Sequence, residues 1–201
     1  RVIPVIEGLK TRVNVPISID TWKSGVARKA LEVGARIVND ISGFHFDPNM
    51  PDVVAEYGAS VILMHIKGTP KTMQQHPTYQ NVLREVMDYL AEGIEKAQAN
   101  GIQQIIVDPG IGFGKRLIDN LEILRGLCEL KQLGFPVLVG PSRKSFIGMI
   151  LDLPVEQRLM GTAAAIAASI LNGANVVRVH DVSAMKQLAS VVDAIRLGKA
   201  V

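Results

Sequence analysis

The sequence of 201 residues has little cysteine, few aromatic residues and only a small net charge of +3. Its single cysteine, Cys128, excludes an intramolecular disulfide and fits a reducing compartment, so we expect a cytoplasmic protein. We expect Cys128 to pack within an apolar helix. Aromatic residues make up 4% of the chain and Lys and Arg form no run, which argues against nucleic-acid binding. No apolar stretch reaches the roughly 20 residues of a membrane span.

The composition is that of one globular domain. Hydrophobic residues make up 48% of the chain and charged residues 20%, and no linker divides it, so we expect a single domain over residues 1–201. At the start, Val2, Val5, Ile6 and Leu9 share a helical face without an N-cap or an initiator methionine. This pattern predicts a fragment that begins inside a helix.

Six short apolar segments alternate with helical patterns. The spacing predicts strands at residues 15–19, 36–38, 60–64, 105–107, 136–139 and 175–179. It predicts the helices that follow at about 23–33, 50–56, 79–100, 120–133, 156–172 and 183–197. This alternation is typical of an α/β fold with a parallel sheet. A doubly wound sheet and a (β/α)8 TIM barrel both fit the alternation.

Polar residues end all six strands, rather than those at one switch point, and this favours the barrel. A barrel typically has eight strand–helix units in about 250 residues. We therefore expect about six of the eight units in this chain, with the first two missing.

The segment at residues 105–115 is the most informative part of the chain. Its apolar strand ends at Asp108, and Gly110, Gly112 and Gly114 follow. Carboxyl ends of parallel strands are where α/β folds bind ligands, and glycines permit positive φ and close approach. An ordinary turn capped by Asp108 explains the segment equally well on its own.

The earlier strands also end in polar residues, which a barrel would bring to one face. Asp20 is a candidate ligand-binding residue or an N-cap, and Asn39 is a candidate or a turn residue. We expect Asp40 to form a turn. Met64 is a core residue that could also face a ligand, and His65, of opposite parity, should be structural.

The later strands end in cations. Arg178 and His180 lie two apart, so both should point to one face, and a solvated anion site avoids burying the guanidinium. Of the two cations at residues 143–144, we expect one to be solvated and Lys144 to point inward, as a phosphate clamp or a Schiff-base amine. Together the strand ends suit a ligand with a polar heterocycle at one end and phosphate at the other.

At these residues the sequence resembles the dihydropteroate synthases over essentially the whole chain. The motifs that carry the resemblance are residues 18–21 (SIDT), 38–41 (VNDI), 63–65 (LMH), 68–73 (GTPKTM), 108–115 (DPGIGFGK), 142–145 (SRKS) and 178–181 (RVHD). The resemblance implies a (β/α)8 barrel and a transferase of folate biosynthesis, the target of sulfonamides. Such an enzyme condenses 6-hydroxymethyl-7,8-dihydropterin diphosphate with 4-aminobenzoate to 7,8-dihydropteroate and diphosphate.

The resemblance also implies substrate contacts, residue by residue. The residues implied to hold the pterin are Asp20, Asn39, Asp108 and Lys144. Those implied to line its slot are Ile41, Met64, Gly112 and Phe113. Those implied to border the aminobenzoate are Ser142, Lys144 and Phe113, and those implied to grip the diphosphate are Arg178 and His180. Lys144, Arg178 and His180 would be the catalytic groups.

A cofactor and a partner are implied as well. The family uses Mg²⁺, bound with help from an Asn in a strand–helix unit that would precede Arg1, so we expect no metal ligand in this chain. The chain alone should then be inactive. The helix around residues 162–168 is apolar almost all round, which fits either the family's homodimer or close packing on the sheet.

Three other functions stay open. A pterin-dependent methyltransferase shares the barrel and the pterin carboxylates, although it has no diphosphate for Lys144 and Arg178 to hold. A Schiff-base aldolase would use Lys144 as its nucleophile. A non-catalytic pterin-binding module would bind without turnover.

Overall fold

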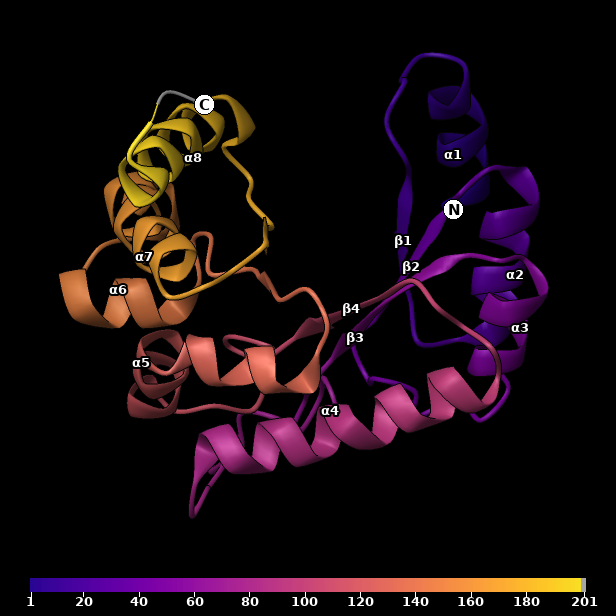
Figure 1. The fold of residues 1–201 in the computed structure, drawn as a ribbon, viewed down its shortest axis with the longest axis horizontal. Helices are drawn as coiled ribbons and strands as arrows, with labels where there is room; N and C mark the ends of the chain where they lie inside the picture. The colour runs from indigo at the N-terminus through magenta and orange to yellow at the C-terminus, as the bar shows by residue number, and fades with distance from the viewer. Residues whose placement is uncertain (200–201) are drawn as a thin grey trace. The chain divides into compact units, whose positions relative to one another are not determined.

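The computed structural model describes residues 1–199, and Figure 1 shows their helices and strands. Strands and helices alternate along the chain, as the sequence predicts for an α/β fold. Two compact units are present. The first comprises Arg1–His65 and Asp88–Asp108, and the second comprises Ile66–Met87 and Pro109–Val201.

The first unit is built on a parallel sheet of four strands. These are β1 (Ser18–Asp20), β2 (Ile37–Asp40), β3 (Ser60–Met64) and β4 (Ile105–Asp108). Each strand pairs in parallel with the next one along the chain, so the order does not reverse within these four. Val38, Val61 and Val107 are fully buried, as expected for β-branched residues in a sheet covered on its faces.

Three short helices complete this unit, and α4 begins in the second unit and continues into the first. They are α1 (Ile3–Lys10), α2 (Ser24–Val33) and α3 (Met50–Glu56), followed by α4 (Val82–Ala99). Figure 1 shows α2 next to α3, and α2 also contacts α1. Gly34 ends α2 at a φ of 124°, a backbone conformation that glycine adopts readily.

The second unit joins a short parallel pair of strands to four helices. The strands are β5 (Leu138–Val139) and β6 (Val176–Val177). The helices are α5 (Leu117–Arg125), α6 (Ser145–Leu151), α7 (Leu159–Leu171) and α8 (Val182–Leu197), with 3-10 segments at Leu127–Leu133 and Val155–Gln157. α7 packs against α5, α6 and α8, and the buried Ile166, Ile170 and Met185 form the core between α7 and α8.

All six predicted strands are present, and the predicted bounds of β3 and α3 agree with the structure. The helix predicted at 120–133 instead begins at Leu117, and a 3-10 segment follows its end near Gly126. Leu127 and Leu130 are buried there at the three-residue period of a 3-10 helix, which turns Cys128 outward. The packing role expected for Cys128 is therefore wrong.

Two further differences concern helices. The sequence prediction missed α6, whose apolar run SFIGMIL has no helical alternation. The helix predicted at 156–172 begins only at Leu159, because a 3-10 turn at Val155–Gln157 precedes it. Of the predicted face of α1 only Ile6 is buried, because α1 packs mainly against α2.

Among residues 1–199 no helix is long and apolar enough to cross a bilayer.

Candidate functional site

The carboxyl edge of the four-stranded sheet carries a paired acid and amide. Asp20 of β1 and Asn39 of β2 are opposite one another in the parallel register, and Asn39 Nδ2 donates to Asp20 Oδ2 at 3.2 Å. Asn39 is only 3% exposed, and its Oδ1 is a buried acceptor without a hydrogen-bond partner in the described part of the chain. Such an atom costs about 1–3 kcal/mol, so it marks a place where a ligand N–H can bind.

At the same edge of the sheet, β3 ends at Met64 and β4 ends at Asp108. These last residues of β3 and β4 are aligned in the parallel register, and both are buried, with Asp108 5% exposed. Ile41, directly after β2, is buried as well. The structure thus brings the predicted pterin-binding residues of the first unit to one sheet edge, because parallel strands all end on the same side.

Two polar residues beside these have structural roles, as predicted. The fully buried Asp40 accepts hydrogen bonds from Ser42 N at 2.8 Å, Ser42 Oγ at 2.7 Å and Phe44 N at 3.1 Å, which closes a turn. Burial raises the pKa of this carboxyl. His65 is buried with its ring edge-on to Tyr89 at 4.8 Å.

The glycine-rich loop belongs to the second unit, and its glycines are conformationally required. Gly110, Gly112 and Gly114 have φ values of 69°, 83° and 64°. A Cβ on Gly114 would lie 2.4 Å from the carbonyl oxygen of Lys67. Tyr79 donates from its hydroxyl to the Gly114 carbonyl at 2.6 Å. The polar segment at residues 67–79 therefore packs directly on this loop.

Three side chains that sequence reasoning did not assign hold the loop in place. Lys115 donates to two loop carbonyls. The buried Asn120 accepts from Gly112 N at 2.7 Å, and Gln74 donates to Gly112 O at 2.9 Å. The one sequence signal for Lys115 was its place at the end of the 108–115 motif. Asn120 and Gln74 had none, because their partners are backbone atoms elsewhere in the chain.

The Lys144 side chain points at this loop. It is the N-cap residue of α6 and half-buried, and its Nζ donates to the Ile111 carbonyl. The same Nζ lies 4.7 Å from the centre of the Phe113 ring, a cation–π distance. A Cβ on Gly112 would lie 3.0 Å from Lys144 Cδ, which is a tight contact, and its φ of 83° also favours glycine. Gly112, Phe113 and Lys144 therefore form one group.

Two side-chain links join residues 142–144 to residues 178–181. The Ser142 hydroxyl is 2.9 Å from His180 Nδ1 and accepts from His180 N at 3.2 Å. Arg143 Nη2 and Nε donate to the two carboxylate oxygens of Asp181 at 2.5 and 3.0 Å. These hydrogen bonds from Arg143 lower the pKa of Asp181.

Arg143 itself corrects an expectation. The sequence predicts it as the solvated cation of the pair. In the structure it is half-buried and ion-paired, because Asp181, on the next strand end, is within reach of its guanidinium. Its backbone has a φ of 57°, a left-handed conformation that is costly for a residue with a side chain. Strain of this kind persists where surrounding bonds fix it.

Arg178 and His180 follow the end of β6. Arg178 N still donates to the Val139 carbonyl at 3.0 Å, which extends the pairing with β5. Arg178 and His180 are exposed and Val179 between them is half-buried, in agreement with the predicted common face. In the second unit the structure thus places His180 beside Ser142, and Lys144 beside Phe113 and Gly112.

Replacing Arg143 by methionine should lower kcat/KM about tenfold for the reaction that the resemblance implies, because small displacements of positioned groups are costly. The change removes the link to Asp181 while Lys144 and His180 keep their own side chains. Steady-state kinetics measure the effect. Arg143→Lys should recover little, since an ammonium cannot form the two-pronged contact.

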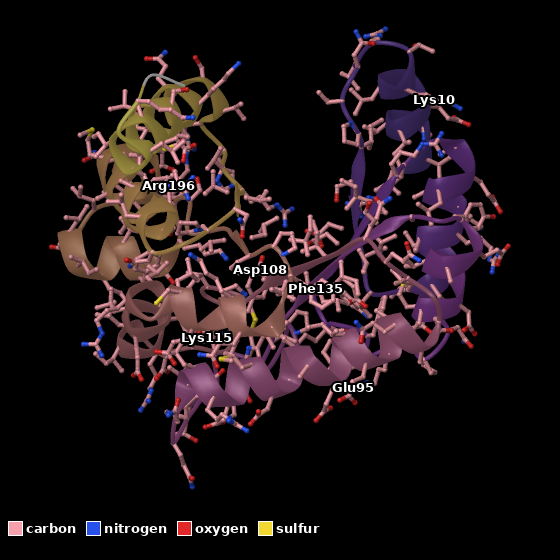
Figure 2. All side chains as sticks on the ribbon, viewed as in Figure 1. Lys10, Glu95, Asp108, Lys115, Phe135 and Arg196 are labelled. Atoms are coloured by element: carbon pink, nitrogen blue, oxygen red, sulfur yellow. The ribbon has the colours of Figure 1, made fainter. Side chains whose placement is uncertain are left out.

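The matched control for this change is Arg196→Met. Arg196, labelled in Figure 2, pairs with Asp193 at 2.8 Å on the surface of α8. Its loss should leave kcat/KM unchanged. Equal kinetics for Arg143→Met and Arg196→Met would contradict a positioning role for the Arg143–Asp181 pair.

A metal site would need several ligands together. Within residues 1–199 no three or more His, Cys, Asp or Glu side chains are grouped so that they could hold a metal ion. The described residues therefore form no metal site from protein side chains alone, whereas Mg²⁺ is often held by one or two carboxylates together with substrate phosphates.

Comparisons with known proteins identify the family of the chain. A family described as pterin binding enzyme matches residues 1–180. The dihydropteroate synthase of Synechocystis sp. is 50% identical over 198 residues, covering 97% of this chain and 68% of the relative. That of Escherichia coli K12 is 42% identical over 196 residues, covering 96% of this chain and 69% of the relative.

Solved structures give the same result. Yersinia pestis dihydropteroate synthase in a sulfonamide drug complex matches with a TM-score of 0.95 at 37% identity, covering 99% of this chain and 73% of that one. The Thermus thermophilus enzyme in complex with 4-aminobenzoate matches with a TM-score of 0.91 at 39% identity, covering 96% and 79%. The chain belongs to the pterin-binding enzyme family and, within it, to the dihydropteroate synthases.

Proposed function

We propose that this protein condenses 6-hydroxymethyl-7,8-dihydropterin diphosphate with 4-aminobenzoate, forming 7,8-dihydropteroate and diphosphate in folate biosynthesis. The observation that carries the proposal is the sheet edge where Asp20, Asn39 and Asp108 lie, with Asn39 Oδ1 buried and unpartnered in the described chain. Structures of relatives were solved with pteroic acid, 4-aminobenzoate and 6HMPPP.

The pterin would bind through polar groups at this edge. Asp108 would accept two parallel N–H bonds from an amidine-like ring edge, and Asn39 would offer a donor and an acceptor. Hydrophobic and glycine residues would form the walls of the slot. Those proposed for the walls are Ile41, Met64, Gly112 and Phe113.

The diphosphate end would be bound by cations. Arg178 can grip phosphate oxygens with its planar guanidinium, and His180 adds a donor through Nε2, since Ser142 engages Nδ1. Diphosphate leaves with the electrons of the C–O bond once its charge is matched. The CH₂ cation that remains is delocalised into the pterin ring, and carboxylates such as Asp20 and Asp108 stabilise it.

The second substrate would be held by Ser142, Lys144 and Phe113. The aryl ring packs against Phe113, and the Lys144 ammonium attracts the carboxylate. The amine nitrogen forms the new C–N bond and gives up one proton to solvent. No protein nucleophile takes part, so Lys144 acts as a donor and a charge rather than as a Schiff base.

The proposal extends to the fold and the compartment. We propose a single pterin-binding domain with a (β/α)8 barrel, to which this chain would contribute about six units. The sequential order of β1 to β4 supports the barrel, because a doubly wound sheet reverses its order at the switch point. We also propose a cytoplasmic location, for which the single cysteine of the chain is the support.

Mg²⁺ is proposed as the cofactor on the resemblance alone. When bound it would neutralise charge on the diphosphate. Turnover in EDTA, with and without added Mg²⁺, tests this requirement.

A homodimer is proposed on the apolar surface of the second unit. A hollow of about 450 Å³ lies between α5, α6 and α7 and is lined by Phe146, Ile147, Ala164 and Ala168 among others. Met160 nearby is 77% exposed. Apolar area of this kind is typical of an interface. Sedimentation of the protein at several concentrations tests it.

The deciding experiment is an assay of the purified protein, in the length its gene encodes, with both substrates. We expect dihydropteroate and diphosphate in equal amounts. Tight binding of methyltetrahydrofolate without binding of the pterin diphosphate would favour the methyltransferase. Borohydride trapping of a carbonyl compound on Lys144 would favour the aldolase. Pterin binding without product would leave a binding module.

A further inference from the structure

Lys115 is a buried lysine whose ammonium lies against the backbone of the glycine-rich loop. The residue, labelled in Figure 2, is 4% exposed. Its Nζ donates to the Gly110 carbonyl at 2.9 Å and to the Phe113 carbonyl at 3.1 Å. Burying an ammonium is costly unless hydrogen bonds and opposite charge compensate it. The hydrogen bonds from the Lys115 ammonium to the two carbonyls are therefore needed to offset the cost of burying its charge.

The charge of Lys115 has an acidic neighbour. Asp119 is the third residue of α5 and is buried. Its two carboxylate oxygens accept hydrogen bonds from the Arg116 guanidinium at 2.7 and 2.9 Å. Burial alone would raise the pKa of Asp119, but the hydrogen bonds from Arg116 and the nearby charges of Arg116 and Lys115 outweigh it and lower the pKa. The charge of Lys115 thus adds to that of Arg116 in favouring the ionised form of Asp119.

The two carbonyls that Lys115 holds bracket the part of the loop that meets Lys144. Between them lies Ile111, whose carbonyl accepts from Lys144 Nζ. At the second of them is Phe113, whose ring lies 4.7 Å from the same Nζ. A continuous set of contacts thus runs from Lys115 through the loop backbone to Lys144.

The neighbouring glycine has its own support. Gly112 N donates to Asn120 Oδ1 at 2.7 Å, and Gly112 O accepts from Gln74 at 2.9 Å. Loss of the Lys115 ammonium would therefore release Phe113 and Gly110 more than Gly112. In the proposed function Phe113 borders both substrates, whereas Gly112 borders the pterin alone. The wall of the pterin slot therefore keeps Gly112 and its two hydrogen bonds when the ammonium is lost, and the aminobenzoate site has no such second support.

We propose that Lys115 is a positioning residue for the second substrate: its ammonium fixes the Phe113 backbone, and thereby the ring of Phe113 and the amine of Lys144, where 4-aminobenzoate binds. The inference rests on the proposed function, because it assigns Phe113 and Lys144 to that substrate. Lys115 itself touches neither substrate.

The test compares Lys115→Met with the wild type in steady-state kinetics that vary each substrate in turn. The KM for 4-aminobenzoate should rise about tenfold or more, while the KM for the pterin diphosphate changes less than about threefold. Lys29→Met, an exposed lysine of α2, is the control and should change neither. A merely structural role would lower the melting temperature and the active fraction and leave both KM values unchanged, which would overturn the proposal.

Two further variants cover the case in which Lys115→Met does not fold. Lys115→Arg keeps the charge but replaces the single amine by a planar fork, and it too should raise the KM for 4-aminobenzoate selectively. Lys115→Cys can be alkylated with 2-bromoethylamine in the unfolded state and then refolded. This restores a side chain of nearly the length of lysine that ends in an ammonium group. Its KM should return toward the wild-type value.

The alkylation needs a background of Cys128→Ser, because Cys128 is exposed and would react as well. The same treatment of Cys128→Ser alone is the control. If the wild type forms no dihydropteroate, the proposed function fails. If it does form product and the alkylated protein keeps the KM of unmodified Lys115→Cys, the inference about Lys115 fails and the proposed function stands.

Discussion

Replacing Asp108 by asparagine should weaken binding of 6-hydroxymethyl-7,8-dihydropterin diphosphate about a hundredfold, since two charge-assisted hydrogen bonds contribute roughly 1.5–3 kcal/mol each in favourable cases. Asp108 is buried at the end of β4, where the dielectric screening of its charge is weak. The asparagine keeps the shape of the side chain but offers one acceptor and an unwanted donor. Isothermal titration of the ligand measures the loss.

Two other acids serve as controls for this change. Asp52→Asn replaces an exposed carboxylate in the first turn of α3 and should change neither binding nor stability appreciably. Asp40→Asn replaces a buried carboxylate that closes a turn, so it should lower the melting temperature with little effect on the affinity of the folded protein. An Asp108→Asn protein that bound the pterin as well as Asp52→Asn would exclude Asp108 from the site.

The strand ends were predictable from the sequence because two local patterns mark them. Apolar β-branched runs gave the strands, and a polar residue at the end of each run gave Asp20, Asn39 and Asp108. These residues do lie at one edge of a parallel sheet. Their common position follows from local patterns plus the rule that parallel strands share an end.

The supports of the site were not predictable in the same way. Lys115 and Asn120 act on backbone carbonyls and amides, and such partners leave no signature in the sequence. Arg143 was assigned to solvent because its partner, Asp181, lies 38 residues further along the chain. Cys128 was misplaced because a 3-10 segment replaced the expected α-helix and changed which residues turn inward.

The sequence favours Lys144 over Arg143 as the inward cation, and in the structure both are half-buried but have different partners. Lys144 is drawn to a carbonyl and an aromatic face of the glycine-rich loop, whereas Arg143 is taken up by Asp181. The position of each of the two side chains is therefore determined by its partner, and the order of the residues alone does not predict that partner. That Lys144 and the acids of the first unit bind one substrate stays a prediction.

Replacing Arg178 by methionine should weaken binding of the pterin diphosphate by about thirty- to a hundredfold, because the guanidinium can form two charge-assisted hydrogen bonds with phosphate oxygens. The same change should leave the affinity for 6-hydroxymethyl-7,8-dihydropterin, which has no phosphate, within about twofold of the wild type. Arg12→Met, another exposed arginine, is the control and should affect neither ligand. Titration of both ligands against each variant measures the difference.

The Arg178 and Asp108 variants together test whether the two sets of residues hold opposite ends of one ligand. Asp108→Asn should weaken both pterins equally and leave inorganic diphosphate unaffected, whereas Arg178→Met should weaken inorganic diphosphate and the pterin diphosphate alone. In the double variant the two losses of binding free energy should add, as expected for groups that touch different parts of a ligand. If Arg178→Met weakened the phosphate-free pterin as much as its diphosphate, Arg178 would not be the phosphate-binding residue. If Asp108→Asn weakened inorganic diphosphate, the assignment of the carboxylate to the pterin ring would be wrong.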